Sequence, residues 1–376
     1  MLKKELIVFL FFCAIKTSII AQTNCLVQFK DYIETSNTYS IYICDKPNIP
    51  LFNLPVDSVL EFEIKTDFER IFSTEKDEQS RIPGTLCYTV NQKKVELPIS
   101  IKARGRTRFA FCMYKPLEIK FDKPVYSTIF NGINDEISII THCGEKNSKQ
   151  WIFKATESEY KNKLLGEYYL YSILETLGTI TRSVSLCKIK YININDSILT
   201  ENFAFVLEPD ENVANRCNLV LNKKNIHLLD ESSIKNTILI NYFITNYDWE
   251  LEYFDSTGWL GSNLKILKSE KGAGYLLPYD FDLNAILYPE YWKNKGESFD
   301  EYCYRFQGVL SDLFYDKKNQ ESVYQIYIKI PEIRAILENS YLDIEYKERF
   351  IYWIDSFEFI LYSHLSRFNK YRRLLK

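Results

Sequence analysis

The chain reads Asn246-Tyr247-Asp248-Trp249, then Ser262-Asn263-Leu264-Lys265, then Leu277-Pro278-Tyr279-Asp280-Phe281-Asp282. Three carboxylates and two side-chain amides therefore lie close together in sequence, each beside aromatic or apolar residues. Asp and Asn are poor strand formers and are seldom buried without a partner. Their oxygen atoms suit Mg²⁺ or Mn²⁺, which proteins commonly bind together with substrate phosphates. An acidic base, an amide and then an Asp after a strand is an order typical of phosphoryl-transfer enzymes. The simpler interpretation is a turn with solvated carboxylates.

The chain before this stretch carries the alternating pattern of half-buried strands. Leu60, Phe62 and Ile64 alternate with charged residues, which indicates one apolar and one solvated face. Similar patterns predict further strands at 86–90, 95–101, 117–121, 137–140, 184–192 and 203–208. Between the fourth and fifth of these, the apolar spacing changes to that of a helix ending near Gly178. The first part of the chain is therefore predicted to be mainly β.

The remainder of the chain is predicted to be mainly helical. Residues 231–246 and 344–370 carry apolar side chains at helical spacing, and those of the second segment occur almost all round the helix. Two short strands, 263–267 and 275–278, carry the polar residues quoted above. This order predicts an α+β fold, a protein-kinase-like bilobal fold with a β-rich N-terminal lobe and a helical C-terminal lobe.

Residues 1–21 have the features of a signal peptide. Two lysines precede an apolar run, and Ile20-Ala21 offers a cleavage site. The apolar run is too short to span a bilayer as a helix. We expect an exported protein, periplasmic, at the cell surface or secreted, which is not an integral membrane protein after cleavage. The predicted parts are the signal peptide 1–21, an N-terminal extension 22–56, a β-rich N-lobe with one helix 57–208, and a helical C-lobe carrying the acidic site 209–376.

The net charge and the cysteine and histidine content exclude several kinds of binding partner and of catalytic site. A net charge of −3 argues against general nucleic-acid binding. Nine cysteines in an exported chain favour disulfides, and we expect Cys112 and Cys143 to pair because they flank neighbouring predicted strands. Three histidines and no CxxC pair argue against a structural zinc site and against Ser-His or Cys-His catalysis. His142 is expected to be a packed side chain.

Two further charged segments have both a functional and a structural interpretation. Arg104, Arg106 and Arg108 follow a predicted strand, where arginines can grip phosphate groups. They can equally protect a solvated edge strand from aggregation. Glu208-Pro209-Asp210-Glu211 is expected to be a solvated hinge between the two lobes.

Three motifs occur in a fixed order between about residues 95 and 290. They are Arg104-Gly105-Arg106-Thr107-Arg108 with Lys115-Pro116-Leu117-Glu118-Ile119-Lys120-Phe121, then Phe205-Val206-Leu207-Glu208, then Asn246-Tyr247-Asp248 with Asn263 and Pro278-Tyr279-Asp280-Phe281-Asp282. Together they resemble the CotH-type spore-coat kinases and related exported proteins. The first motif is similar to that family's RGxSxR and KPxxxKF strand-turn-strand. The last is similar to its Asn-x-Asp, trailing Asn and Pro-aromatic-Asp-x-Asp.

The resemblance implies phosphoryl transfer from ATP, with Mg²⁺ or Mn²⁺, to a hydroxyl group of a protein substrate. Asp248 matches the catalytic-loop Asp that positions or deprotonates the acceptor. Metal ligation is implied for Asn263, Asp280 and Asp282, although Asn263 follows Asp248 at a longer spacing than in ordinary protein kinases. The residues implied for cofactor binding are Arg104, Arg106, Lys120 and Glu167.

The sequence does not identify the phosphate-binding lysine that would pair with Glu167. The candidates are Lys115, Lys120 and Lys154. There is also no GxGxxG loop. A second hypothesis is therefore a non-catalytic, degenerate kinase-fold protein that acts as an extracytoplasmic interaction or cell-surface module. A third is a glycosidase that uses two of the three aspartates across an aromatic-lined cleft.

Overall fold

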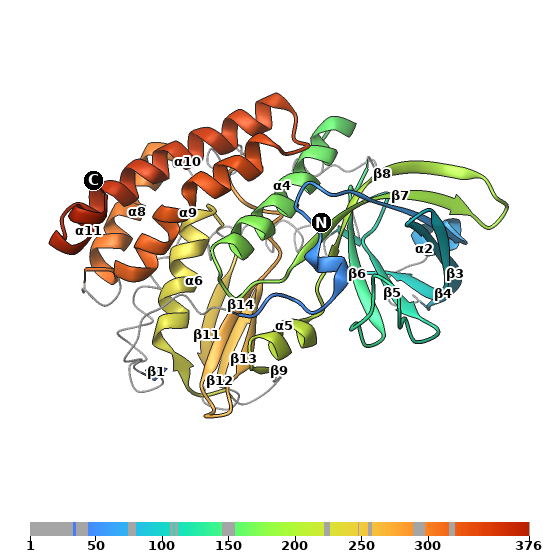
Figure 1. The fold of residues 1–376 in the computed structure, drawn as a ribbon, viewed down its shortest axis with the longest axis horizontal. Coiled ribbons are helices and arrows are strands. Elements are labelled where there is room, and N and C mark those ends of the chain that lie inside the picture. The colour runs from blue at the N-terminus through green and yellow to red at the C-terminus, as the bar shows by residue number, and fades with distance from the viewer. Residues whose placement is uncertain are drawn as a thin grey trace, which may run out of the picture.

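The computed structural model describes residues 33–34, 44–73, 80–105, 108–109, 112–144, 155–221, 226–246, 248–254, 258–288, 298–315 and 320–375. The predicted signal peptide, Arg106 and Lys154 lie outside the described residues. A β-barrel forms one side of the molecule, and a group of helices forms the other, with the long helix α4 (Glu157–Thr176) between them (Figure 1).

Seven strands close into the barrel in the order β2-β3-β4-β5-β6-β8-β7. Their bounds are β2 (Leu60–Thr66), β3 (Ile82–Val90), β4 (Lys93–Ala103), β5 (Leu117–Phe121), β6 (Glu136–Thr141), β7 (Val184–Asn193) and β8 (Ile198–Leu207). All neighbouring pairs are antiparallel except β2 with β7, whose parallel register places Leu60 opposite Cys187 and closes the barrel. Phe62 and Ile64 point into its core, as the alternating sequence pattern predicted.

Helix α4 is fixed at both ends by local sequence. Thr156 and Glu159 form a capping box, in which the Glu159 N–H donates to the Thr156 hydroxyl and the Thr156 N–H donates to the Glu159 carboxylate. The helix stops before Gly178, whose φ of 72° is the left-handed conformation that glycine adopts without steric cost. The helix predicted from the sequence in this region is confirmed.

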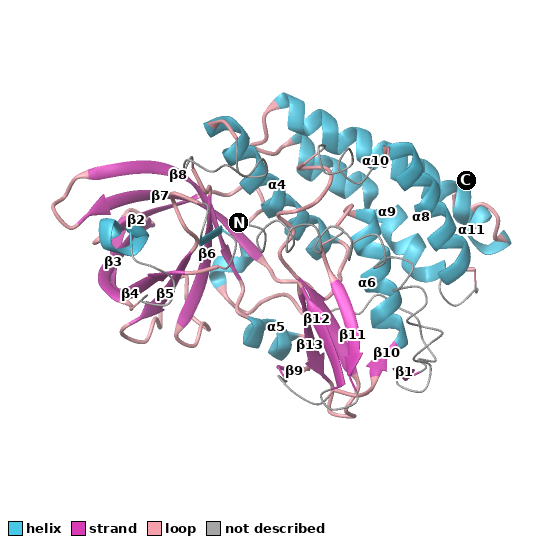
Figure 2. Ribbon diagram, turned by 180° about the vertical axis from the view of Figure 1, so that it is seen from behind, coloured by secondary structure: helices cyan, strands magenta, loops and turns pink. Residues whose placement is uncertain are grey.

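The second half of the chain contains both strands and helices. A mixed sheet has the order β1 (Ile33–Glu34), β10 (Leu229–Asp230), β14 (Gly274–Pro278), β13 (Leu264–Lys268) and β9 (Val220–Leu221), and β11 (Glu250–Phe254) pairs with β12 (Gly258–Ser262). The longer helices of this half are α6 (Glu231–Phe243), α8 (Phe299–Leu313), α9 (Gln320–Glu338) and α10 (Ile344–Leu365). The short helices among the described residues are η2 (Pro50–Asn53), α2 (Phe68–Ser73), α5 (Asp210–Arg216) and α11 (Asn369–Leu374). Seen from behind, α8, α9, α10 and α11 pack together on the side away from the barrel (Figure 2).

The prediction of a protein-kinase-like bilobal fold, with a β-rich N-terminal lobe and a helical C-terminal lobe, is wrong. The structure contains a closed mixed barrel. The half of the chain predicted to be mainly helical contributes the two predicted strands, which are β13 and β14, and also β9, β10, β11 and β12. Leu186 of β7 and Phe205 of β8 belong to the same hydrophobic cluster as side chains of α6 and α10, so these two strands pack on the helices with one face. Their other face belongs to a separate cluster, which fills the barrel. Alternation in sequence identifies single strands, but it does not reveal that β2 and β7, far apart in the chain, pair and close a barrel.

Two disulfides connect distant parts of the described chain. Cys112 pairs with Cys143, which confirms the predicted pair, and Cys44 pairs with Cys217. Disulfides persist in oxidising compartments, so both are compatible with an exported protein. Among the residues that the structure describes, no helix combines the length and the apolar character needed to cross a membrane.

Candidate functional site

The polar residues quoted from the sequence meet where β13 and β14 end side by side. Leu264 is opposite Pro278 in the antiparallel register, and the Tyr279 N–H donates to the carbonyl of Asn263 at 3.1 Å. Asn263 and Asp280 both adopt the left-handed conformation, with φ of 51° and 65°. Asn and Asp tolerate this conformation better than other non-glycine residues. The local sequence therefore turns both side chains out of the sheet at the same edge.

Asn263 holds Asp248, the predicted catalytic residue, through its side-chain amide. The Asn263 Nδ2 donates to Asp248 Oδ2 at 2.9 Å and to the Asp248 carbonyl at 2.5 Å. The Asp248 N–H in turn donates to the side chain of Asn246, whose own amide is hydrogen-bonded to the buried Asn241 of α6. Two of the predicted site residues are thus in contact, and α6 anchors the loop that carries them.

Asp280 and Asp282 form the acidic centre of the site. The charge of Asp282, followed by burial, raises the pKa of Asp280 well above its usual range, and Glu167 and Asp248 act in the same direction. The backbone N–H of Asp280 donates to the hydroxyl of Tyr171 at 3.1 Å. In the described chain no hydrogen bond or ion pair reaches the Asp280 carboxylate itself. The site therefore concentrates negative charge that its own residues compensate only in part.

Arg108 is the cation that approaches this cluster. Its Nη2 lies 2.5 Å from Glu167 Oε2, and its Nε lies 2.9 Å from Asp282 Oδ2. Glu167 on α4 is 2 % exposed, and burial against the charge of Arg108 leaves its pKa raised to about 7. The expected partner of Glu167 was a lysine, and the partner in the structure is Arg108, which was expected to bind phosphate. An ion pair between a turn and a helix leaves no periodic signal in the sequence, so this pairing was not predicted.

A cleft of about 470 Å³ opens beside the acidic cluster. Its charged walls are three cations, Arg104, Arg182 and Lys265, and six carboxylates, while Tyr279 is the one aromatic side chain among its described lining residues. The carboxylates are those of Glu118, Asp135, Glu136, Glu208, Asp210 and Glu211. Arg182 bonds Asp210 through both Nε and Nη2, and its guanidinium lies 4.8 Å from the centre of the Tyr279 ring. Burial, and then the charge of Arg182, lower the pKa of Arg104. Arg182 and Lys265 are both paired with Asp210, whereas Arg104 has no ion pair with a described residue. An anionic ligand in the cleft would therefore contact Arg104 directly and compete with Asp210 for the other two cations.

Sequence reasoning identified Arg104 of this cleft but missed Arg182 and Lys265. Arg182 lies between Thr181 and Ser183 and belongs to no motif. Lys265 belongs to the quoted Ser262–Lys265 segment, but nothing in that segment assigns it a role, so only the fold brings the two cations together. The segment from Leu207 to Pro209 also lines the cleft. Glu208 was predicted to lie in a solvated hinge, and this is wrong for its side chain, which is 1 % exposed and ion-paired with Arg216.

The predicted lysines lie away from the acidic cluster where the structure describes them. Lys120 is exposed on β5 and lies 3.3 Å from Asp135. Lys115 is 3 % exposed, donates to the carbonyl of Phe72 and packs over the ring of Phe109. The structure thus brings together Asp248, Asn263, Asp280, Asp282 and Glu167, with Arg104 in the adjoining cleft, and does not bring Lys120 to them.

The acidic cluster offers two carboxylates, of Asp280 and Asp282, and the amide of Asn263 as possible metal ligands. Within the described ranges, no group of three or more His, Cys, Asp or Glu side chains is arranged to hold a metal ion. Mg²⁺ commonly needs only one or two carboxylates when substrate phosphates and water supply the other ligands. Asp280 and Asp282 match that requirement, and Asn263 has an amide oxygen with no hydrogen bond from the described residues.

Comparison with known proteins adds no family assignment, because no family model matches the chain and no curated protein matches it.

Proposed function

We propose that this protein binds ATP with Mg²⁺ or Mn²⁺ outside the cytoplasm and transfers the terminal phosphoryl group to a hydroxyl of a protein substrate. The observation that carries the proposal is the position of the acidic cluster, around Asp280, at the edge of a cleft that contains Arg104, Arg182 and Lys265. Carboxylates beside cations are the two halves of a site for a metal-bound polyphosphate. The proposal rests on these side chains and not on the fold, since one fold can host many functions.

The contacts of the acidic cluster suggest a role for each residue. Asp248, which accepts a hydrogen bond from Asn263, would accept the proton of the acceptor hydroxyl as the hydroxyl oxygen attacks the terminal phosphorus. The bond from that phosphorus to the bridging oxygen then breaks, and ADP leaves. The carboxylates of Asp280 and Asp282 and the amide oxygen of Asn263 would hold the divalent cation. A bound cation would neutralise phosphate charge during the transfer.

The cations of the site have a separate role in this proposal. Arg104, Arg182 and Lys265 would bind phosphate oxygens in the cleft, where partial burial strengthens each charge-assisted hydrogen bond. Arg108 acts as a positioning residue, because it joins α4 to the loop that carries Asp282. Residues from the end of β4, from the segment before β7, from β13 and from the loop after β14 would in this way surround one nucleotide.

The second candidate is a non-catalytic interaction or cell-surface module. The observation that favours it is the ion pair between Arg108 and Asp282, which occupies one carboxylate oxygen of the proposed metal site. The glycosidase hypothesis has less support, because charged side chains dominate the lining of the cleft.

Equilibrium binding of Mn²⁺ and ATP by titration calorimetry tests the proposal. Wild type should bind ATP only when Mn²⁺ is present, and Asp280→Asn should abolish this binding. Asp196→Asn is the matched control, because Asp196 has the same left-handed conformation, φ 67°, but lies on an exposed turn of the barrel. Equal binding by Asp280→Asn and wild type would contradict the assigned site.

Transfer is tested separately from binding. Asp248→Asn should bind Mn²⁺ and ATP as wild type does, but should lose incorporation of labelled phosphate into itself or into casein, a hydroxyl-rich probe. A single general base contributes about 10²- to 10⁴-fold to rate. Metal-dependent binding by wild type without any incorporation would favour the non-catalytic candidate.

A further inference from the structure

Helix α10 is apolar on more of its surface than the single chain covers. Apolar residues occur almost all round the segment 344–370, a pattern typical of a helix that is buried on every side. One side of α10 packs on its neighbouring helices, where Phe350, Trp353 and Phe357 are buried. The other side is exposed, and α10 runs along the outer edge of the helical group (Figure 2). Part of the apolar surface of α10 therefore has no cover within the chain.

Three aromatic side chains make up this exposed face, which we call the aromatic stripe. Tyr352 is 61 % exposed, Phe359 is 70 % exposed and Tyr362 is 45 % exposed. Spacings of seven and three residues place them along one side of the helix. The ring of Phe299 on α8 lies 5.4 Å from that of Tyr352, and the ring of Tyr327 on α9 lies 6.3 Å from that of Tyr362. Adjoining exposed aromatic side chains that are held in place in this way mark an interaction surface.

The charges at the two ends of α10 differ in sign. Residues 343–349 carry three carboxylates and two cations, whereas residues 367–373 carry four cations and no carboxylate. Glu348 lies on the stripe one turn before Tyr352, and it is exposed. Arg367, just beyond the end of α10, is also exposed, and neither of these two charged side chains has an ion pair with a described residue. The stripe therefore runs from an acidic end to a basic end.

We propose that the aromatic stripe is the interface of a homodimer, in which α10 packs antiparallel on α10 of a second copy. An antiparallel two-fold arrangement brings Tyr352 of each copy against Phe359 of the other, so one patch serves both partners. The same register places Glu348 opposite Ser363 of the second copy, one turn from Arg367 of that copy. A parallel arrangement would instead bring the two basic ends together. The stripe is therefore self-complementary when the two helices are antiparallel.

Asp355 lies at the centre of the stripe, where the two-fold axis would bring its two copies together. Its carboxylate lies 2.7 Å from Nη2 of Arg334 on α9, and the same nitrogen lies 3.0 Å from Glu358. The guanidinium reduces the repulsion between the two Asp355 carboxylates at the axis. A single pair of helices buries less surface than a standard interface, so we expect a dissociation constant in the micromolar range.

Sedimentation velocity of the chain without residues 1–21, at concentrations up to about 200 µM, tests the proposal. Wild type should convert from monomer to dimer as the concentration increases, and Phe359→Asp should weaken this association at least about thirtyfold. Tyr126→Asp is the matched control, because Tyr126 is an aromatic residue 77 % exposed between β5 and β6 of the barrel, and it should dimerise like wild type. Both variants should keep the circular dichroism spectrum of wild type, since both side chains are exposed.

Charge reversal separates the antiparallel pairing from other uses of the stripe. Glu348→Arg or Arg367→Glu alone places like charges near each other and should weaken dimerisation about threefold to tenfold. The double variant restores opposite charges and should recover wild-type association. The proposal is overturned if wild type stays monomeric, even if it then binds lipid vesicles, because that result would assign the stripe to a membrane surface. It is also overturned if Phe359→Asp dimerises like wild type or if the double variant shows no recovery.

Discussion

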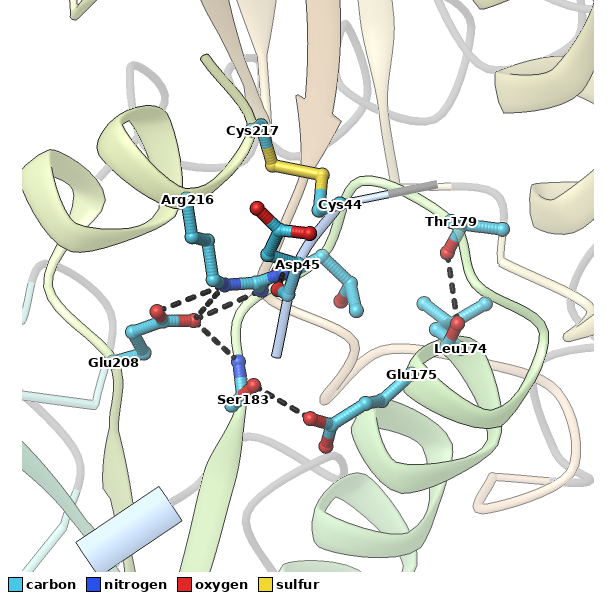
Figure 3. Close-up of a disulfide and its surroundings, with 10 residues drawn as sticks. Cys44, Asp45, Leu174, Glu175, Thr179, Ser183, Glu208, Arg216 and Cys217 are labelled. Atoms are coloured by element: carbon cyan, nitrogen blue, oxygen red, sulfur yellow. Dashed lines mark hydrogen bonds and ion pairs between the residues drawn. A yellow bond between two sulfur atoms is a disulfide. The ribbon is translucent and has the colours of Figure 1, made fainter. Parts of the chain in front are cut away.

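Glu208 and Asp280 are two carboxylates near the same cleft with opposite surroundings. Glu208 accepts hydrogen bonds from Arg216 and from the Ser183 N–H, so its charge is fully compensated (Figure 3). Asp280 faces Asp282, Glu167 and Asp248, and its pKa is raised. A compensated buried charge holds structure together, whereas an uncompensated one costs stability and marks a place where a ligand is expected.

The largest effect is expected from breaking the compensated pair. Glu208→Ala leaves the guanidinium of Arg216 buried without its counter-ion, which should lower the free energy of unfolding by about 3–5 kcal/mol. Urea unfolding followed by circular dichroism measures this loss. Glu211→Ala, at an exposed position in the first turn of α5, is the control and should cost less than about 1 kcal/mol. Equal losses in both variants would mean that the buried ion pair of Glu208 contributes no more to stability than the exposed carboxylate of Glu211.

The buried histidines provide a second test, because their pKa values determine how stability depends on pH. Burial lowers the pKa of His142 and of His364 to about 4, against 6.5 in a free chain. Below pH 6.5 the unfolded state gains protons that the folded state does not, so stability falls as pH decreases toward 4. The free energy of unfolding falls by about 1.4 kcal/mol per pH unit for each histidine. At pH 5 the total loss is about 2 kcal/mol for each histidine.

Stability measured from pH 7 to pH 5 in wild type and in His364→Gln isolates one of these contributions. His364 is 5 % exposed, and its Nε2 lies 2.9 Å from the Gln320 side chain. The variant should lose less stability than wild type over this range. Parallel curves for the two proteins would mean that His364 titrates normally in the folded state.

The smallest effect has the opposite sign. Asp280→Asn removes one of the repelling charges while keeping an amino acid that tolerates a positive φ. Without nucleotide, the free energy of unfolding of the variant should exceed that of wild type by about 0.5–2 kcal/mol. The reason is that charged residues kept for function, such as Asp280 beside Asp282, commonly lower the stability of the folded state. Urea unfolding at pH 7 measures the change. A destabilised variant would show that Asp280 is compensated in a way that its surroundings do not reveal.

The sequence predicted the acidic cluster because its residues lie in three short segments at the ends of two antiparallel strand pairs. Asp248 precedes β11, Asn263 links β12 to β13, and Asp280 and Asp282 follow β14, so local pairing brings them close. Glu167 lies on α4, the helix that the apolar spacing of the sequence predicted. The Cys112–Cys143 pair followed in the same way from adjacent strands.

The remaining features depend on long-range packing that leaves no local pattern. Barrel closure rests on one parallel pairing of β2 with β7. The partner of Glu167 is Arg108, which lies 59 residues earlier, and Arg182 reaches the cleft from the segment before β7. Glu208 is buried because Arg216, the last residue of α5, donates a hydrogen bond to its carboxylate. Hydrophobic periodicity describes which face of an element is buried, but not which charges meet there.

Thermal unfolding of wild type and Asp280→Asn, each with and without ATP and Mg²⁺, tests the central claim most directly. The account predicts that the order of stability reverses, with the variant more stable alone and the wild type more stable with ligand. Ligand at one hundred times its dissociation constant stabilises by about 2.7 kcal/mol, a shift of a few degrees for a chain of this size. The same order in both conditions, with no nucleotide-dependent shift in wild type, would contradict the claim that this acidic cluster binds a metal–nucleotide complex.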